Sequence, residues 1–331
     1  MTPVSVLVII VNYRTPALAL EAAASLEAEV LARGDSHVVI VENGSGDNSA
    51  EIIAAGIAER GLGAWCSLLP VVENRGFAAG NNEGLRWYQR ETGGLPEFAW
   101  LLNPDTTAHP NAIGALLAFM ADNPNAGIVG SRCLWEDGRI RFSAFHFPSL
   151  ASELTHAIAF GPITRLLGDQ EVVVPISDRP VRADWVSGSS FMIRRAVIER
   201  IGLMDEGYFL YFEESDYCAR AADAGFEVWT VPQSVITHIG GQATGITGAQ
   251  RGSKRRPRYW FAARARFFAR RYGAAYANLA NLAWLFGYPL GRAIDAVRGK
   301  KRDDPPFFWL DFLRHYYGLG GLMYRRGKVS Q

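Results

Sequence analysis

Apolar runs alternate with helical patterns along the first third of the chain, and polar turns separate them. Four segments are predicted to be strands: Val4–Val11, His37–Val41, Ser67–Val72 and Phe98–Leu102. Helices are expected between them, over Ala17–Ala32, Ser49–Arg60 and Ala79–Arg90. This alternation predicts right-handed βαβ units and a mostly parallel sheet in an α/β fold. In such sheets ligands bind beyond the carboxyl ends of the strands.

The pattern becomes less regular in the middle of the chain. A hairpin is expected around Asp137-Gly138, an irregular excursion over Gly161–Pro180, and a helix near Ser215–Ala224 that Gly225 ends. Beyond about Gly245 the sequence is basic and aromatic, and then helical to its end. We therefore expect two parts, an α/β domain over residues 1–245 and a helical C-terminal extension over residues 246–331.

Composition is that of a soluble globular protein, with 49% apolar and 20% charged residues in 331. The net charge of +1 gives no electrostatic argument for nucleic acid or for a membrane. The charges are nevertheless segregated along the chain. No acidic residue occurs between Glu227 and Asp295, whereas Arg251–Arg271 holds nine Lys or Arg residues.

Cysteine spacing and the apolar segments indicate in which cellular compartment the protein is expected. The three cysteines, Cys66, Cys133 and Cys218, are far apart and form no C-x-x-C pair, which disfavours a disulfide framework or a zinc knuckle and fits a reducing cytosol. The amino terminus lacks the layout of a signal peptide. Tyr272–Gly291 is uncharged but contains Pro289 and two asparagines, which favours an amphipathic or buried helix over a membrane span. A cytoplasmic location is expected.

A carboxylate follows the fourth predicted strand, in Asn103-Pro104-Asp105. At the ligand edge of a parallel sheet Asp105 can hold a hard cation, which needs oxygen ligands and can bridge two phosphates. Asn-Pro-Asp is also common turn chemistry, so that Asp105 as a turn residue is the alternative. The residues alone leave both interpretations open.

Polar loops that contain glycine follow the second and third predicted strands. Side chains of Glu42–Asp47 can bind a nucleobase or ribose, although an ordinary turn with Asp47 as a helix cap has the same composition. Glu73–Asn82 places glycines where the backbone can approach a ligand closely, and its alternative is a plain loop before a helix.

Three carboxylates lie together in Phe209–Cys218, flanked by aromatic residues: Glu213, Glu214 and Asp216. Like charges and partial burial raise the pKa of a carboxyl group, which suits a general base. Acids near a helix amino terminus also favour the helix dipole, but a solvated first turn would not need aromatic flanks. His238 follows an apolar run and precedes Gly240 and Gly241, which leaves space for a phosphate or a metal; a structural role is the alternative.

Seven segments in chain order resemble family 2 glycosyltransferases, in their rhamnosyltransferase-like branch: VNYR, VENGSGD, ENRGFAAGNN, LLNPDT, DWVSGSSFMIRR, FLYFEESDYCARAADAGF and THIGG. The resemblance covers about Val4 to Gly241 and extends more loosely into Arg258–Gly273. It implies a GT-A fold, which is a Rossmann-like, mostly parallel sheet flanked by helices. Three positions depart from the family pattern: Glu42 replaces the usual Asp, Asp105 lacks a full Asp-x-Asp, and Glu213-Glu214 replaces the common Glu-Asp.

The resemblance also implies a reaction, inverting transfer of a sugar from a nucleotide-diphosphate sugar. Glu214 would be the base that deprotonates the acceptor hydroxyl, if it is the counterpart of the family Asp, with Glu213 and Asp216 beside it. Asp105 would bind Mg²⁺ or Mn²⁺ on the diphosphate, and His238 would support the metal or the diphosphate. Trp185 and Gly188 would shape the acceptor site. The implied nucleotide-sugar site comprises Asn12, Tyr13, Glu42, Asn43, Arg75, Gly76, Asn82 and Asn103.

The implied partners follow from this reaction. The donor that the resemblance favours is dTDP-L-rhamnose, and the acceptor is a glycan or a lipid-linked glycan in cell-surface polysaccharide synthesis. For the basic stretch Arg251–Arg271 three interpretations remain: a solvated helix face, a clamp over the donor diphosphate, and contact with an anionic membrane or a lipid-pyrophosphate acceptor. A catalytically silent nucleotide-sugar-binding scaffold of the same fold is the alternative function, and the neutral overall charge disfavours nucleic acid as a partner.

Overall fold

The computed structural model describes residues 3–166, 172–240, 255–302 and 304–316. The chain divides into two compact units. The first contains residues 1–145, 173–209 and 213–245, and the second contains residues 146–172, 210–212 and 246–331. The second unit thus includes two earlier segments besides the C-terminal residues, and the division into functional domains at residue 245 stays a prediction.

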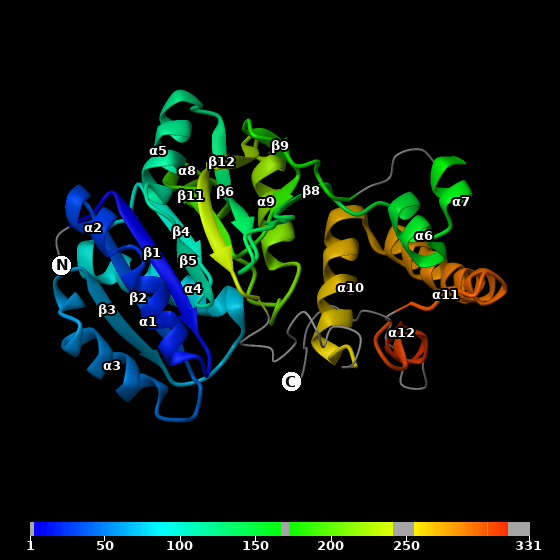
Figure 1. Cartoon of the computed structure of the whole chain (residues 1–331), viewed down its shortest axis with the longest axis horizontal. Coiled ribbons are helices and arrows are strands. Elements are labelled where there is room, and N and C mark those ends of the chain that lie inside the picture. The colour runs from blue at the N-terminus through cyan, green and yellow to red at the C-terminus, as the bar shows by residue number, and fades with distance from the viewer. Residues whose placement is uncertain (1–2, 167–171, 241–254, 303, 317–331) are drawn as a thin grey trace. The chain divides into compact units, whose positions relative to one another are not determined.

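A ten-stranded sheet forms the centre of the first unit. Figure 1 shows β3, β2, β1 and β4 side by side, and these four strands are parallel. β11 runs antiparallel between β4 and β6, whereas β12 is parallel to β6. The predicted α/β class with a mostly parallel sheet is confirmed. The strands are β1 (Val6–Asn12), β2 (Ser36–Asn43), β3 (Cys66–Val71), β4 (Phe98–Leu102), β5 (Thr106–Ala108), β6 (Ala126–Leu134), β7 (Ile140–Arg141), β9 (Val181–Ala183), β11 (Ser190–Arg194) and β12 (Glu227–His238). A separate two-stranded sheet consists of β8 (Ala144–Phe145) and β10 (Trp185–Val186).

Helices cover both faces of β1, which explains its nearly continuous apolar sequence. Val8 and Ile10 belong to the core cluster that contains the apolar residues of α1. On the other face, Gly84 and Gly80 of α4 lie so close to Ile9 and Val11 that an added Cβ would meet either side chain at 2.8 Å. The helices of this unit are α1 (Pro16–Ala24), α2 (Glu27–Arg33), α3 (Ser49–Glu59), α4 (Phe77–Thr92), α5 (Ala112–Asp122), α8 (Arg195–Ile201) and α9 (Glu213–Asp223), with a 3₁₀ turn at Leu62–Ala64.

The first predicted helix, Ala17–Ala32, consists of two helices, α1 and α2. Ser25 stands at the break. Its hydroxyl donates a hydrogen bond to the Ala22 carbonyl and accepts one from the Ala108 backbone N–H of β5. A contact with a strand that is distant in sequence therefore sets the break, and the helical pattern alone does not contain it.

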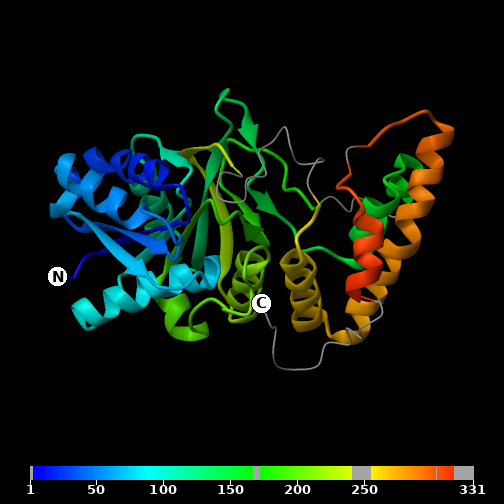
Figure 2. The ribbon, with the colours of Figure 1, turned by 90° about the horizontal axis from the view of Figure 1, so that it is seen from below.

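The second unit is helical. It contains α6 (Leu150–Ile158), α7 (Gly161–Leu166), α10 (Arg258–Tyr272), α11 (Ala274–Val297) and α12 (Phe308–Tyr316). Figure 2 shows α6 and α12 alongside α11. Phe261, Phe308 and Phe312 form its apolar core. The Gly161–Pro180 segment, expected to be irregular, begins with α7. Among the described residues, no helix combines the length and apolar character needed to cross a membrane.

Candidate active site

Polar residues of several predicted motifs lie at the carboxyl ends of parallel strands. Asn12 ends β1 and stands opposite Glu42 in the register with β2, and Asn43 is the last residue of β2. Asn103 directly follows β4, and His238 ends β12. The sheet thus gathers these residues on one edge, where open α/β sheets bind ligands.

Asp105 and His238 are in contact at this edge. The turn after β4 is closed by a hydrogen bond of 2.6 Å from the Thr106 hydroxyl to the Asn103 carbonyl. β5 then pairs with β12 so that Thr106 stands opposite His238. The His238 Nε2 lies 3.1 Å from the Asp105 Oδ1, and both residues are 6% exposed. Asp105 is therefore a turn residue that also meets a second potential ligand.

This pair fits part of a divalent-cation site. Neighbouring ligands of an octahedral cation with bonds of about 2.1 Å are about 3 Å apart, close to the observed separation. The buried Nδ1 of His238 has no hydrogen-bond partner among the described residues. Within those residues, no group of three His, Cys, Asp or Glu side chains could hold a metal. A cation here would need further oxygen ligands from a diphosphate or water.

The two glycine-containing loops after β2 and β3 are joined by hydrogen bonds. The Asn43 Nδ2 donates to the Asn74 Oδ1 and to the Gly76 carbonyl, both at 3.2 Å. Gly44 has a φ of +65, in the left-handed region that favours glycine, and a Cβ there would lie 2.5 Å from the Asn74 backbone nitrogen. Glu42 accepts a hydrogen bond of 2.8 Å from the Ser45 N–H. Predicted nucleotide-binding residues from two separate motifs are thus adjacent.

Asn12 and Tyr13 complete the β1 end of this region. The Asn12 side chain is fully buried, and its Oδ1 accepts hydrogen bonds from the Thr15 backbone N–H and hydroxyl. Its buried Nδ2 has no partner within the described part of the chain. Tyr13 is half-buried, with the Arg14 guanidinium 5.1 Å from its ring centre. An unsatisfied buried hydrogen-bond donor at this edge suits a ligand that brings a hydrogen-bond acceptor.

Arg75 and Asn82 have structural partners that the sequence did not indicate. Arg75 forms ion pairs with Glu83 at 2.9 Å and Glu206 at 3.1 Å. Asn82 donates to the Met204 carbonyl and to Glu206, and accepts from the Met204 N–H. Both side chains hold the loop before α9 against α4, so their predicted contact with a nucleotide sugar stays a prediction. Glu206 belongs to no recognisable motif.

The backbone at Gly76 approaches the segment that precedes α9. Gly76 has a φ of +99, and a Cβ there would lie 2.1 Å from the Phe209 carbonyl oxygen. The Phe77 N–H donates to the same carbonyl at 2.9 Å. Only glycine fits this position, because backbone rather than a flexible side chain occupies the space. The loop after β3 is thereby held beside the acidic motif that contains Glu213 and Glu214.

The acidic motif begins a helix, and the expected start near Ser215 is wrong by two residues. Glu213 and Glu214 lie in the first turn of α9 rather than on the preceding loop. Tyr211 and Phe212 have left-handed backbone conformations, with φ of 75 and 68, which turn the chain just before the helix. Such conformations are uncommon for aromatic residues, so the local pattern did not indicate this start.

Burial raises the pKa of both glutamates. The Glu214 residue is partly exposed, but its Oε2 atom is buried and has no hydrogen-bond partner among the described residues. This burial raises the pKa of Glu214 to about 7, against backbone hydrogen bonds at Glu214 and Gly188 that lower it. Burial, and then the charge of Glu214, raises the pKa of Glu213 well above its usual range. One of these carboxyl groups can therefore accept a proton near neutral pH.

Asp216 has a different environment. It accepts hydrogen bonds from the Tyr208 hydroxyl at 3.1 Å and from the Arg220 Nε at 2.9 Å. Arg220 also donates to the carbonyls of Ile201 and Leu203. Asp216 is thus a positioning residue that anchors α9, and a direct part in catalysis stays a prediction.

Gly188 adjoins Glu214. A Cβ on Gly188 would lie 3.8 Å from the Glu214 Oε1 and 3.5 Å from the Phe77 ring. Trp185, three residues earlier, stacks on Phe145 with ring centres 4.3 Å apart, because β10 pairs with β8. The glycine therefore keeps space open beside the carboxylate, where the acceptor was predicted to bind.

Comparisons with known proteins identify similar sequences. The model of the family described as glycosyltransferase like family 2 matches residues 3–273. An N-acetylglucosaminyl-diphospho-decaprenol L-rhamnosyltransferase of Mycobacterium tuberculosis is 30% identical over 218 residues, which are 63% of this chain and 68% of that protein. The low-salt glycan biosynthesis hexosyltransferase Agl10 of Haloferax volcanii is 28% identical over 65% of this chain and 60% of its own length.

The fold is shared with solved glycosyltransferases. The mannosyltransferase PcManGT from Pyrobaculum calidifontis, solved with GDP-Man and Mn²⁺, superposes with a TM-score of 0.55 at 18% identity, over 91% of this chain and 77% of that one. The family match covers most of the sequence, including every segment that carries the site described above. The chain belongs to the family 2 glycosyltransferases and is a glycosyltransferase of the GT-A fold.

Proposed function

We propose that this enzyme transfers a sugar, with inversion, from a nucleotide-diphosphate sugar to the hydroxyl group of a glycan or lipid-linked glycan. One observation carries the proposal. The Glu214 carboxyl has a pKa raised to about 7 and lies beside Gly188, which has no side chain, in the same compact unit as the Asp105–His238 pair. A base and a site for the leaving diphosphate are the two parts that such a transfer needs.

Glu214 is the proposed base. A carboxyl group with a pKa of about 7 is ionised in about half of the molecules at neutral pH and can accept a proton. As the acceptor oxygen forms its bond to the anomeric carbon, the bond from that carbon to the diphosphate oxygen breaks, and the hydroxyl proton passes to Glu214. A single displacement from the opposite face inverts the anomeric carbon, and no residue of the chain becomes bound to the sugar.

Asp105 and His238 are the proposed ligands of Mg²⁺ or Mn²⁺. A divalent cation supplies positive charge that neutralises the departing diphosphate. The separation of 3.1 Å between the His238 Nε2 and the Asp105 Oδ1 and the burial of both residues support this assignment. PcManGT, of the same fold, was solved with Mn²⁺. The Asn103 Nδ2 lies 3.4 Å from the same His238 nitrogen, so Asn103 borders the proposed cation site.

The loops after β1, β2 and β3 are the proposed nucleotide site. The unpaired Asn12 amide and the linked loops of Glu42, Asn43 and Gly76 support it. In this proposal Tyr13 borders the same region, and Arg75 exchanges one carboxylate partner for the nucleotide sugar.

The donor that we propose is dTDP-L-rhamnose, and the acceptor is a lipid-linked glycan of cell-envelope polysaccharide synthesis. The name of the mycobacterial relative supports the sugar and the acceptor, because it specifies L-rhamnosyl transfer and a sugar diphosphate on a polyprenol. The proposed place of work is the cytoplasm at the inner face of the membrane. The three buried, unpaired cysteines fit a reducing compartment.

A transfer assay tests the proposal. The protein is incubated with Mg²⁺ or Mn²⁺, an N-acetylglucosaminyl-diphospho-polyprenol, and in turn dTDP-L-rhamnose, UDP-galactose, UDP-N-acetylglucosamine or GDP-mannose. We expect product from dTDP-L-rhamnose, with an anomeric configuration opposite to that of the donor by NMR. Retention of configuration would contradict the mechanism. Tight nucleotide-sugar binding without turnover of any donor would favour a silent scaffold.

A further inference from the structure

Helix α11 of the second unit presents an apolar face to the outside. Five large apolar residues on it are exposed, with Phe286 at 68% and Val297 at 90%; the others are Leu279, Leu282 and Leu290. Their spacing of three, four and seven residues places them in one stripe along the helix. Among the exposed residues of α11, Asn278 is the only polar one and none is charged. The stripe extends over about 27 Å at 1.5 Å per residue.

The opposite face of α11 is fixed against the rest of the unit. A Cβ on Gly291 would lie 2.4 Å from the Ile158 carbonyl oxygen of α6, so the two helices pack at backbone distance. Two polar residues of α11 are buried on this side: Asn281 accepts a hydrogen bond from the buried Arg264, and Asp295 is paired with Arg302. This is the reverse of a helix that is solvated on its outer face, where charged residues cover the surface.

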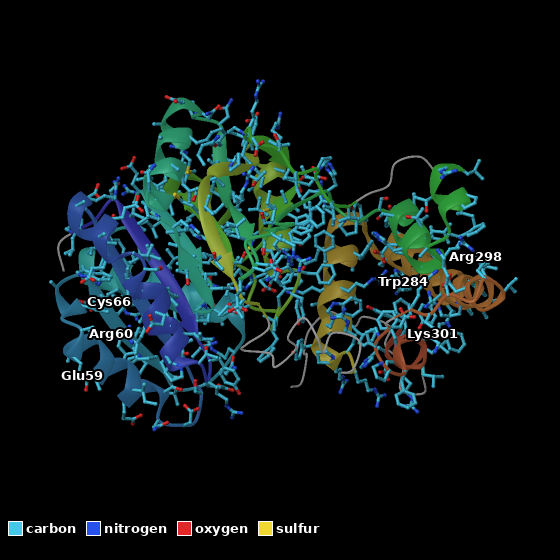
Figure 3. The ribbon with its side chains drawn as sticks, in the orientation of Figure 1. Glu59, Arg60, Cys66, Trp284, Arg298 and Lys301 are labelled. Carbon is cyan, nitrogen blue, oxygen red and sulfur yellow. The ribbon has the colours of Figure 1, made fainter. Side chains whose placement is uncertain are left out.

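Exposed charge in the described part of this unit is positive. Its described residues include fourteen Lys and Arg residues against four carboxylates. Each carboxylate is buried or half-buried and paired with an arginine: Glu153 with Arg264, Asp295 with Arg302, Asp304 with Arg292, and Asp311 with Arg255. Three exposed cations, Arg298, Lys300 and Lys301, directly follow the apolar stripe, and Figure 3 labels two of them.

We propose that α11 lies in the surface of an anionic bilayer, with the stripe below the headgroups and Arg298, Lys300 and Lys301 at the lipid phosphates. Buried apolar area and attraction to anionic lipid together bind such a helix to a membrane. Cations near an anionic leaflet strengthen this binding. A second copy of the chain is a poorer occupant, since the exposed charges of the described part of this unit would repel their equivalents. The inference is independent of the sugar that is transferred, but it accounts for access to a lipid-linked acceptor.

Vesicle flotation of the full-length protein tests this surface. Vesicles of phosphatidylcholine alone are compared with vesicles that contain phosphatidylglycerol. The variant Phe286→Glu/Leu290→Glu places two charges in the stripe. The matched control, Leu31→Glu/Val72→Glu, makes the same kind of change at exposed apolar residues of the first unit. Thermal melting verifies that both variants are folded.

We expect the wild type and the control to float with anionic vesicles, and the stripe variant to bind them at least tenfold more weakly. A triple variant, Arg298→Gln/Lys300→Gln/Lys301→Gln, should lose affinity for anionic vesicles and keep its weak affinity for neutral ones. Equal binding of wild type and stripe variant would overturn the proposal, as would no binding of the wild type. A solution dimer that only the stripe variant dissociates, without vesicle binding, would assign the surface to a second copy. Transfer to a water-soluble acceptor should be unchanged in the stripe variant, which separates this test from that of the reaction.

Discussion

The His238 Nε2 lies 3.1 Å from the Asp105 Oδ1, although the two residues come from the end of β12 and the turn after β4. Antiparallel pairing of β5 with β12 creates this contact. Either residue alone would have an ordinary structural explanation. Together, a carboxylate and an imidazole that are both 6% exposed form a pair of potential metal ligands at the ligand-binding edge of the sheet.

Asp105→Asn should weaken metal-dependent binding of a nucleoside diphosphate at least tenfold and leave the fold intact. The amide keeps the shape of the side chain but removes the negative charge that a hard cation requires. Calorimetry with nucleoside diphosphate, with and without Mn²⁺, measures the difference. Asp137→Asn, in an exposed turn, is the matched control. Unchanged metal-dependent affinity in Asp105→Asn would remove Asp105 from the site.

Gly188→Ala should raise the acceptor KM severalfold while donor affinity stays near that of the wild type. The new methyl group fits the fold, since its nearest neighbours are at 3.5 Å or beyond, but it occupies space beside Glu214. Steady-state kinetics with varied acceptor is the measurement. Gly94→Ala, where a Cβ meets nothing within 4 Å, serves as the control. A variant with wild-type acceptor KM would show that the acceptor binds elsewhere.

Glu213→Gln should stabilise the protein more at pH 8 than at pH 5. Burial raises the pKa of Glu213 in the folded state above its value in the unfolded chain. The folded state therefore binds more protons between these two values, and stability falls as the pH rises through that window. A neutral amide removes this loss. Calorimetric melting at both pH values tests it, with Glu51→Gln in an exposed first turn of α3 as the control. An equal change in Tm at both pH values would contradict the buried, proton-binding state of Glu213.

The sequence predicted the four parallel strands β1 to β4 because their patterns are local. β1 is apolar at successive positions, and both of its faces are covered, by α1 on one side and by α4 on the other. The residues of the candidate site were predicted through the motifs that follow such strands. The Asp105–His238 contact was not, since it depends on the register of β5 with β12.

The start of α9 shows where local patterns fail. Tyr211 and Phe212 have left-handed conformations. Their rings pack on α10. The ring centres of Tyr211 and Tyr259 are 6.1 Å apart, and those of Phe212 and Phe267 are 5.6 Å apart. These contacts join segments about fifty residues apart, so the helix start depends on tertiary packing. The role of Glu206 was missed for the same reason, because its partners Arg75 and Asn82 are 131 and 124 residues away in sequence.

The rate of transfer should rise with pH on the acid side of neutrality. Only the ionised form of Glu214 can accept the acceptor proton, and its pKa is raised to about 7. The value of kcat/KM should therefore increase about tenfold per pH unit well below that pKa and level off above it. A pH series at fixed metal concentration measures this. A profile that is flat between pH 5 and 8 would exclude Glu214 as the titrating base.

The central claim, that Glu214 is the base of an inverting transfer, is tested most directly by turnover of Glu214→Gln measured together with its donor affinity. The account predicts that turnover falls about 10²-fold or more, while donor affinity stays near that of the wild type, because the amide keeps the shape but cannot take the proton. Glu213→Gln, the matched variant one residue away, should lose much less turnover. Abolished turnover in Glu213→Gln together with retained turnover in Glu214→Gln would contradict the account and move the base to Glu213.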